Sequence, residues 1–225
     1  MQHRFLVLLA IFWASAVWAG NNAGGAFTVW PDTGQTKCYN NDVEIPCPAE
    51  GEPFHGQDAQ YQGPVRSYTS LGGGTMVRDN VTGLIWEVKE NGDGTAEYSN
   101  PHDADNTYTW CDPDPATNGG NQGTCGDNDT KDFIDALNSA NFGGHNDWRL
   151  PTLKELVTLV DYGRTDPAID TTFFPNTRAA LYLSATTHAS NTIGAWSVNF
   201  SLGFGYGYYN NKSSYSHVRA VRAGQ

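Results

Sequence analysis

The stretch that decides the fold is residues 144–156, Gly-His-Asn-Asp-Trp-Arg-Leu-Pro-Thr-Leu-Lys-Glu-Leu. Pro151 fixes the backbone directly before Thr152, which suits the start of a helix. Thr152 stands three residues before Glu155, the spacing of an N-terminal capping box. We therefore expect a helix from Thr152 until Gly163 ends it. Its apolar face would comprise Leu153, Leu156, Val157 and Val160.

The residues before this helix predict a structural role for the block. Trp148 and Leu150 are apolar and are expected to be buried. Arg149 lies between them, and a partly buried arginine nearly always has a partner. We expect its guanidinium to hold backbone carbonyls or a carboxylate in the loop that enters the helix.

An earlier segment predicts a first helix. Its apolar residues recur at helical spacing, Asp129 or Thr130 can cap its start, and Gly143 and Gly144 can stop it. The face is formed by Phe133, Ile134, Leu137 and Ala140. The segment is thus typical of a short amphipathic helix.

Strands precede and follow the two helices. Residues 75–79 and 84–88 flank a turn and predict a hairpin. In residues 196–200, Trp, Val and Phe alternate with Ser and Asn, which predicts a strand with one buried face. Residues 217–222 predict a closing strand. The order of strands, helices and strands indicates an α+β fold with an antiparallel sheet and helices to one side.

Composition narrows the class of protein. The chain has 225 residues, of which 12% are aromatic and 16% charged, and it contains 25 Gly and 11 Pro. This suits a folded, loop-rich β protein better than a disordered one. The formal net charge is −11, and all 24 acidic residues lie at or before Asp170. Nucleic-acid binding needs clustered cations, so we do not expect a nucleic-acid partner.

The first residues resemble a secretory signal peptide. His3 and Arg4 precede the apolar run of residues 5–13, and Val17-Trp-Ala19 offers small residues for cleavage. The run is shorter than a membrane-spanning helix needs, and no second candidate follows. We expect residues 1–19 to be removed and the protein to be exported, to the periplasm, the cell surface or the medium.

Export permits disulfides, and the four cysteines fall into two local pairs. Three pairings are possible, and proximity in sequence favours Cys38 with Cys47 and Cys111 with Cys125. A four-cysteine metal site is the alternative, but no Cys-x-x-Cys spacing exists. Residues 20–70 lack periodicity and are expected to form an extended, disulfide-stapled segment.

Several of these stretches resemble the bacterial Lcl-type C-terminal domain family. They are residues 144–156, Asp-Asn-Val-Thr-Gly-Leu-Ile-Trp at 79–86, Ala-Trp-Ser-Val-Asn-Phe at 195–200 and Val-Arg-Ala-Val-Arg at 218–222. Residues 32–38 and 56–61 look like the part that often precedes this domain. The resemblance implies a C-type-lectin-like domain over residues 71–225, in a secreted or surface protein that binds glycans or other surface ligands. It implies no enzymatic activity.

The tail carries the candidate binding residues. Its Tyr, Ser, Gly and Asn residues match the composition of antibody loops, although solvated strands and turns can share it. Arg219 and Arg222 flank the segment and are expected to favour an acidic sugar. The predicted ligand-binding residues are Phe204, Tyr206, Tyr208, Tyr209, Asn211, Ser213, Tyr215 and His217.

Three other functions stay open at this point. A structural or assembly protein of the cell envelope would bury the same aromatic residues in an oligomer. The tail composition also resembles receptors that are diversified by retroelement-directed mutagenesis of Asn codons. An enzyme related to the formylglycine-generating branch of the fold would need a free cysteine pair or a metal, and these cysteines are expected to be paired.

Calcium is the one cofactor that the acidic residues suggest. Residues 127–132, Asp-Asn-Asp-Thr-Lys-Asp, resemble the start of an EF-hand loop, but Lys131 occupies a ligand position and the required Gly is missing. The Glu-Pro-Asn and Gln-Pro-Asp triplets of calcium-dependent lectins are absent as well. Solvated loop residues therefore explain the remaining carboxylates better, and no cofactor is expected. Those carboxylates are Asp103, Asp105, Asp112 and Asp114.

Overall fold

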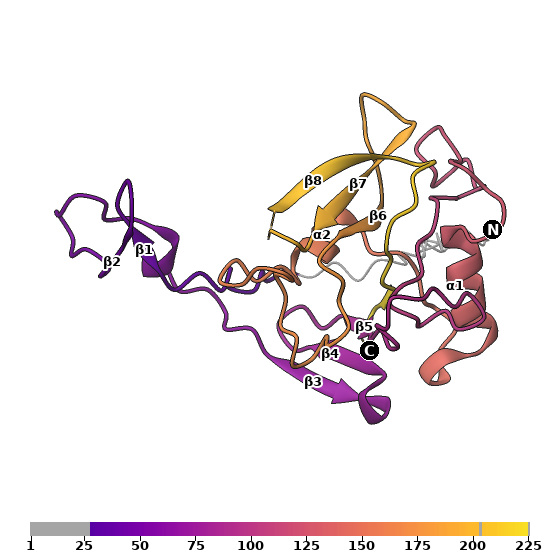
Figure 1. Cartoon of the computed structure of the whole chain (residues 1–225), viewed down its shortest axis with the longest axis horizontal. Helices are drawn as coiled ribbons and strands as arrows, with labels where there is room; N and C mark the ends of the chain where they lie inside the picture. The colour runs from indigo at the N-terminus through magenta and orange to yellow at the C-terminus, as the bar shows by residue number, and fades with distance from the viewer. Residues whose placement is uncertain (1–27, 203, 225) are drawn as a thin grey trace, which may run out of the picture.

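The computed structural model describes residues 28–202 and 204–224, with the backbone alone for 204–208. The expected signal peptide, residues 1–19, lies outside the described residues. Two antiparallel sheets and two helices form the body of the molecule (Figure 1). The predicted α+β class is therefore confirmed, although the expected single sheet is divided in two.

The four-stranded sheet has the strand order β3-β4-β5-β9. Its central hairpin joins β4, Met76–Asp79, to β5, Ile85–Glu87, as the sequence predicts. β3, Tyr68–Leu71, pairs with the outer edge of β4, and β9, Val221–Arg222, pairs with β5. The closing strand is thus shorter than the predicted 217–222.

The three-stranded sheet has the order β6-β7-β8 and lies above the first sheet in Figure 1. It consists of β6, Leu181–Thr187, β7, Gly194–Asn199, and β8, Phe204–Asn211. The predicted alternation in β7 is wrong at its first residue. Ser197 and Val198 are both fully buried, whereas Trp196 is only half-buried. The pairing of β7 with β8 shifts register between Ser197 and Asn199.

Both predicted helices form, and both begin at their expected caps. α1 runs over Thr130–Ser139, and the Asp129 carboxylate accepts the first free N–H groups. α2 runs over Leu153–Val157 with the Thr152 and Glu155 capping box. Residues 158–163 were expected to continue α2 but form turns, because Arg66 binds the carbonyls of Thr158 and Val160.

Two apolar clusters hold these elements together. The first packs α2 between the two sheets, with Trp86, Leu156 and Phe200 among its buried side chains. The second packs α1 against strands of both sheets and includes the buried side chains of Phe133 and Trp148. The described chain also has three short 3₁₀ turns, Asp58–Gln60 in the N-terminal segment and Gly72–Gly74 and Phe142–Gly144 in the body. Among the helices of the described chain, none is long and apolar enough to cross a membrane.

The N-terminal segment projects from the body at one end of its longest axis (Figure 1). It carries the two-stranded ribbon of β1, Cys38–Tyr39, and β2, Glu44–Ile45. The Cys38–Cys47 disulfide closes this ribbon, and the Cys111–Cys125 disulfide lies in the body, so the predicted pairing is confirmed. The division of the chain at residue 70 stays a prediction.

Candidate functional site

An aromatic cluster occupies the outer surface of the three-stranded sheet. We call the side chains of His188, Trp196 and Tyr209 the aromatic face. The His188 ring lies 4.6 Å from the Trp196 ring and 5.3 Å from the Tyr209 ring. All three side chains are half-buried, so each presents an edge or a face to solvent. Trp196 and Tyr209 are direct partners in the pairing of β7 with β8.

Two small contacts orient Tyr209 within this face. The Asn191 amide donates a hydrogen bond of 2.8 Å to the Tyr209 hydroxyl. Gly194 of β7, which pairs with Asn211, lies beneath the Tyr209 ring: a Cβ atom there would stand 1.9 Å from Tyr209 Cε2. The ring therefore rests directly on the backbone of β7.

The loop after β8 adds polar groups beside the aromatic face. Asn211 is two residues beyond Tyr209, so both lie on one face of the strand. Asn211 and Ser213 are exposed, and the Asn211 carbonyl oxygen Oδ1 accepts from the Ser213 backbone N–H at 3.0 Å. Tyr215 is 58% exposed. These three predicted binding residues are therefore accessible.

Lys212 anchors the loop after β8 to the body of the molecule. Its ammonium donates to the Asn118 carbonyl at 3.0 Å and to the Asn121 carbonyl at 2.6 Å. It also lies 3.7 Å from the centroid of the Trp110 ring. Burial lowers the pKa of Lys212, and the negative charge of Asp112 opposes this shift. The exposed side chains of the loop thus stand on an anchored backbone.

The remaining predicted binding residues are placed differently. The side chains of Phe204, Tyr206 and Tyr208 lie outside the described part of the structure. His217 points into the body, where its ring stacks on Tyr182 at 5.4 Å. Burial lowers the pKa of His217, assisted by the charges of Lys89 and Arg178. His217 therefore supports the loop from inside, next to the accessible residues.

The prediction that Arg219 and Arg222 add affinity for an acidic sugar is wrong. Arg219 is fully buried, and it donates to the Glu87 carbonyl at 2.6 Å and to the Thr177 hydroxyl at 2.7 Å. Arg222 is 5% exposed and pairs with Asp147 at 2.7 Å. Both cations are used to fasten the closing segment, so neither is presented to a ligand.

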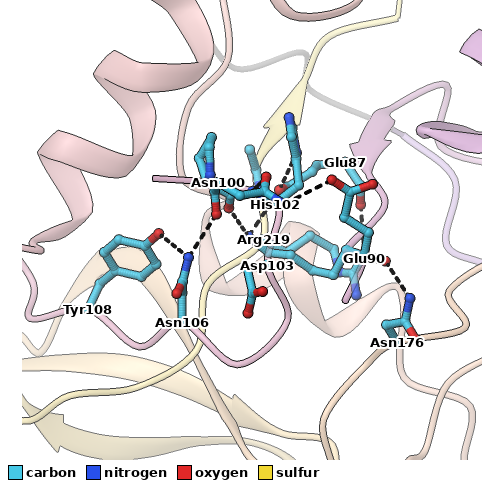
Figure 2. Close-up of polar contacts among 12 residues, drawn as sticks. Glu87, Glu90, Asn100, His102, Asp103, Asn106, Tyr108, Asn176 and Arg219 are labelled. Carbon is cyan, nitrogen blue, oxygen red and sulfur yellow. Dashed lines mark hydrogen bonds and ion pairs between the residues drawn. The ribbon is translucent and has the colours of Figure 1, made fainter. Parts of the chain in front are cut away.

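Figure 2 shows the buried polar network that receives this segment. The Glu87 carboxylate lies 3.0 Å from Lys89 and 2.9 Å from His102, and accepts the Ala220 backbone N–H at 3.0 Å. Burial alone would raise the pKa of Glu87, but Lys89 and His102 lower it. The network joins β5, the following loop and the residues directly before β9.

The Trp-Arg-Leu-Pro-Thr block performs the structural role that the sequence predicts. Arg149 donates to both Glu155 oxygens, at 2.6 and 2.8 Å, and to the Leu150 carbonyl at 3.1 Å. Trp148 is buried, and Leu150 is partly buried against the second cluster. Arg149 and Thr152 together hold Glu155, whose pKa they lower although burial opposes this.

The acidic residues considered for calcium have protein partners. Asp129 caps α1, Asp105 pairs with Arg178, and Asp112 and Asp114 accept backbone or hydroxyl hydrogens from their own loop. Cys111, Cys125 and Asp129 lie close enough to resemble a metal site, but both sulfurs are joined in the disulfide. The side chains of this region thus act as loop and helix supports.

Sequence reasoning missed His188, Gly194 and Asn191 as parts of the site. His188 directly precedes the turn at Ala189 and Ser190, and no periodic pattern marks it. Gly194 could have been noticed, because a glycine in a strand often marks a close approach of another group. Its partner, Tyr209, comes from a strand that begins ten residues later.

Comparison with known proteins gives one match. The family model described as the Lcl C-terminal domain matches residues 75–222. No curated protein and no solved structure matches the chain.

Proposed function

The chain belongs to the Lcl C-terminal domain family, and from this premise we propose that it is an exported, non-enzymatic binding module of C-type-lectin-like fold whose aromatic face recognises a glycan. The binding surface comprises the aromatic face together with Asn211, Ser213 and Tyr215.

The observation that carries this proposal is the half-buried Trp196 and Tyr209 pair beside exposed amide and hydroxyl groups. A pyranose ring presents C–H groups on its faces and hydroxyls around its edge. Aromatic rings contact the first, and Asn, Ser and Tyr side chains exchange hydrogen bonds with the second. The surface thus offers both kinds of contact at one place.

The ligand is a neutral rather than an acidic glycan. Arg219 and Arg222 are buried and paired, and the Lys212 ammonium is enclosed by two carbonyls. The cations of the tail are therefore engaged within the protein, and an acidic sugar would lack a counter-charge from them. The net charge of −11 also disfavours an anionic ligand.

Two features support export and a non-enzymatic role. Both disulfides suit an oxidising compartment. All four cysteines are paired, which removes the thiol that the formylglycine-type alternative would use.

The test is binding of the chain without residues 1–19 to an array of neutral and acidic glycans, followed by titration of the best ligand. Trp196→Ala and Tyr209→Ala should each weaken binding at least tenfold, because interface aromatics cost about 1 to 4 kcal/mol when truncated. Tyr61→Ala, at a 66% exposed tyrosine of the N-terminal segment, is the matched control and should bind normally.

Three outcomes would contradict the proposal. Binding that survives both substitutions in folded protein would exclude the aromatic face as the site. A stable oligomer in light scattering that dissociates in Trp196→Ala would instead favour the assembly protein with this face buried. Selective binding of acidic glycans would contradict the neutral-ligand assignment.

A further inference from the structure

A pocket of about 510 Å³ lies between the disulfide loop 111–125, the first turn of α1 and the Trp-Arg-Leu-Pro-Thr block. We propose that this pocket, here called the α1 pocket, is a second binding site, and that it takes an uncharged, mainly apolar small molecule. Its volume falls within the roughly 300–1,000 Å³ of small-molecule sites. Neither Trp196 nor Tyr209 lines it, so it is separate from the glycan surface.

The lining offers apolar contact rather than hydrogen bonds. Ile134, Leu150 and Ala185 supply apolar surface. The polar groups around them already have partners: the Thr130 hydroxyl bonds the Cys111 backbone at 2.9 and 3.0 Å, and the Asp112 carboxylate accepts from Thr117 at 2.7 Å. A sugar would lose water from its hydroxyls here without gaining equivalent bonds, so a glycan is a poor ligand.

Charge complementarity points to a neutral ligand. Two carboxylates, Asp112 and Asp114, and two cations, Lys131 and Arg149, belong to the lining. Lys131 is paired with Asp135, and Arg149 is paired with Glu155. With Asp135 and Glu155 counted, the surroundings of the pocket hold more carboxylates than cations, in a chain of net charge −11. An anionic ligand would be repelled, and a cationic one would compete with the hydrogen bonds that Asp112 and Asp114 accept from their own loop, so an uncharged ligand fits best.

The walls of the pocket are held in place without a ligand. The disulfide closes the first wall, where the Thr124 N–H donates to the Trp110 carbonyl at 2.9 Å. The second wall is fixed by the two backbone hydrogen bonds between Arg149 and Val221, at 3.0 and 2.9 Å. A preformed pocket spares the ligand the cost of ordering its surroundings.

The experiment titrates the chain without residues 1–19 with N-phenyl-1-naphthylamine, an uncharged aromatic probe whose fluorescence rises in apolar sites. We expect one saturable site per chain, unaffected by 0.5 M NaCl because the contacts are not ionic. Ala185→Leu fills the pocket, and Thr117→Trp crowds its mouth from an exposed position. Each should weaken probe binding at least tenfold.

Matched controls separate the pocket from the rest of the surface. Ala189→Leu and Thr95→Trp make the same changes at exposed positions outside the pocket and should bind the probe like the parent chain. Trp196→Ala should do so as well. If Ala185→Leu does not fold, Thr117→Trp decides the question. Non-saturable binding, unchanged affinity in folded Thr117→Trp, or loss of the site in Trp196→Ala would overturn the proposal.

Discussion

Gly194 illustrates how one residue without a side chain determines the shape of the proposed glycan surface. The Tyr209 ring lies where a Cβ atom of residue 194 would stand, while Asn191 holds the hydroxyl of the same ring. The position of the Tyr209 ring thus depends on the lack of a side chain at residue 194 and on the hydrogen bond from Asn191. Sequence alone could predict Tyr209 as accessible, but not this contact, since it joins two strands.

Gly194→Ala should weaken glycan binding about tenfold while changing the free energy of unfolding by less than about 1 kcal/mol. The new Cβ displaces the ring, whereas the loss of glycine's freedom in the unfolded chain offsets part of the strain. Calorimetric titration and urea denaturation measure the two effects. Gly126→Ala is the control, because a Cβ there meets no atom within 4 Å. Unchanged affinity would show that Tyr209 does not depend on Gly194.

At the scale of elements, local signals were predictable and distant ones were not. The starts of α1 and α2 could be read from sequence because a cap and its partner lie within three residues. The end of α2 could not, because Arg66 takes the Thr158 carbonyl from 92 residues away. The half-buried position of Trp196 likewise could not be predicted from its own strand, because its ring contacts involve His188 and, through it, Tyr209 from other segments.

Thr152→Ala should lower the free energy of unfolding by about 1 kcal/mol. The Thr152 hydroxyl accepts the Glu155 backbone N–H at 3.2 Å and lies 3.0 Å from the Glu155 carboxylate, so its loss removes half of the capping box. Chemical denaturation followed by tryptophan fluorescence measures this. Thr95→Ala, at an exposed loop position, should leave the midpoint in place. Equal midpoints for the two variants would refute the capping role.

The molecule as a whole should lose stability when the pH falls below neutrality. Burial holds the pKa of His217 below its ordinary value of 6.5, so the unfolded chain takes up a proton at a pH where the folded chain does not. Stability is therefore complete above about pH 6.5 and declines as the pH falls toward the folded-state pKa, by at most about 1.4 kcal/mol per pH unit.

Urea midpoints between pH 7.5 and 5.5 measure this decline. His217→Gln should flatten the curve in that range because the titrating group is gone, although the variant loses the stacking on Tyr182 at every pH. An equal slope in both proteins would assign the pH dependence to other groups. Below about pH 4.5, protonation of Glu155 should add a second loss, since Arg149 and Thr152 lower the pKa of its carboxyl.

The position of β9 has a mechanical consequence. The chain enters the four-stranded sheet at Tyr68, opposite Asp79, and its last strand pairs Arg222 with Ile85, so entry and exit flank the same β4–β5 turn. Tension applied through the two ends of the domain would break the hydrogen bonds of the edge strands one after another, in the unzipping geometry. It would not load all of these bonds at once in shear. The same adjacency would let the domain be inserted into a surface loop of a host protein with both junctions side by side.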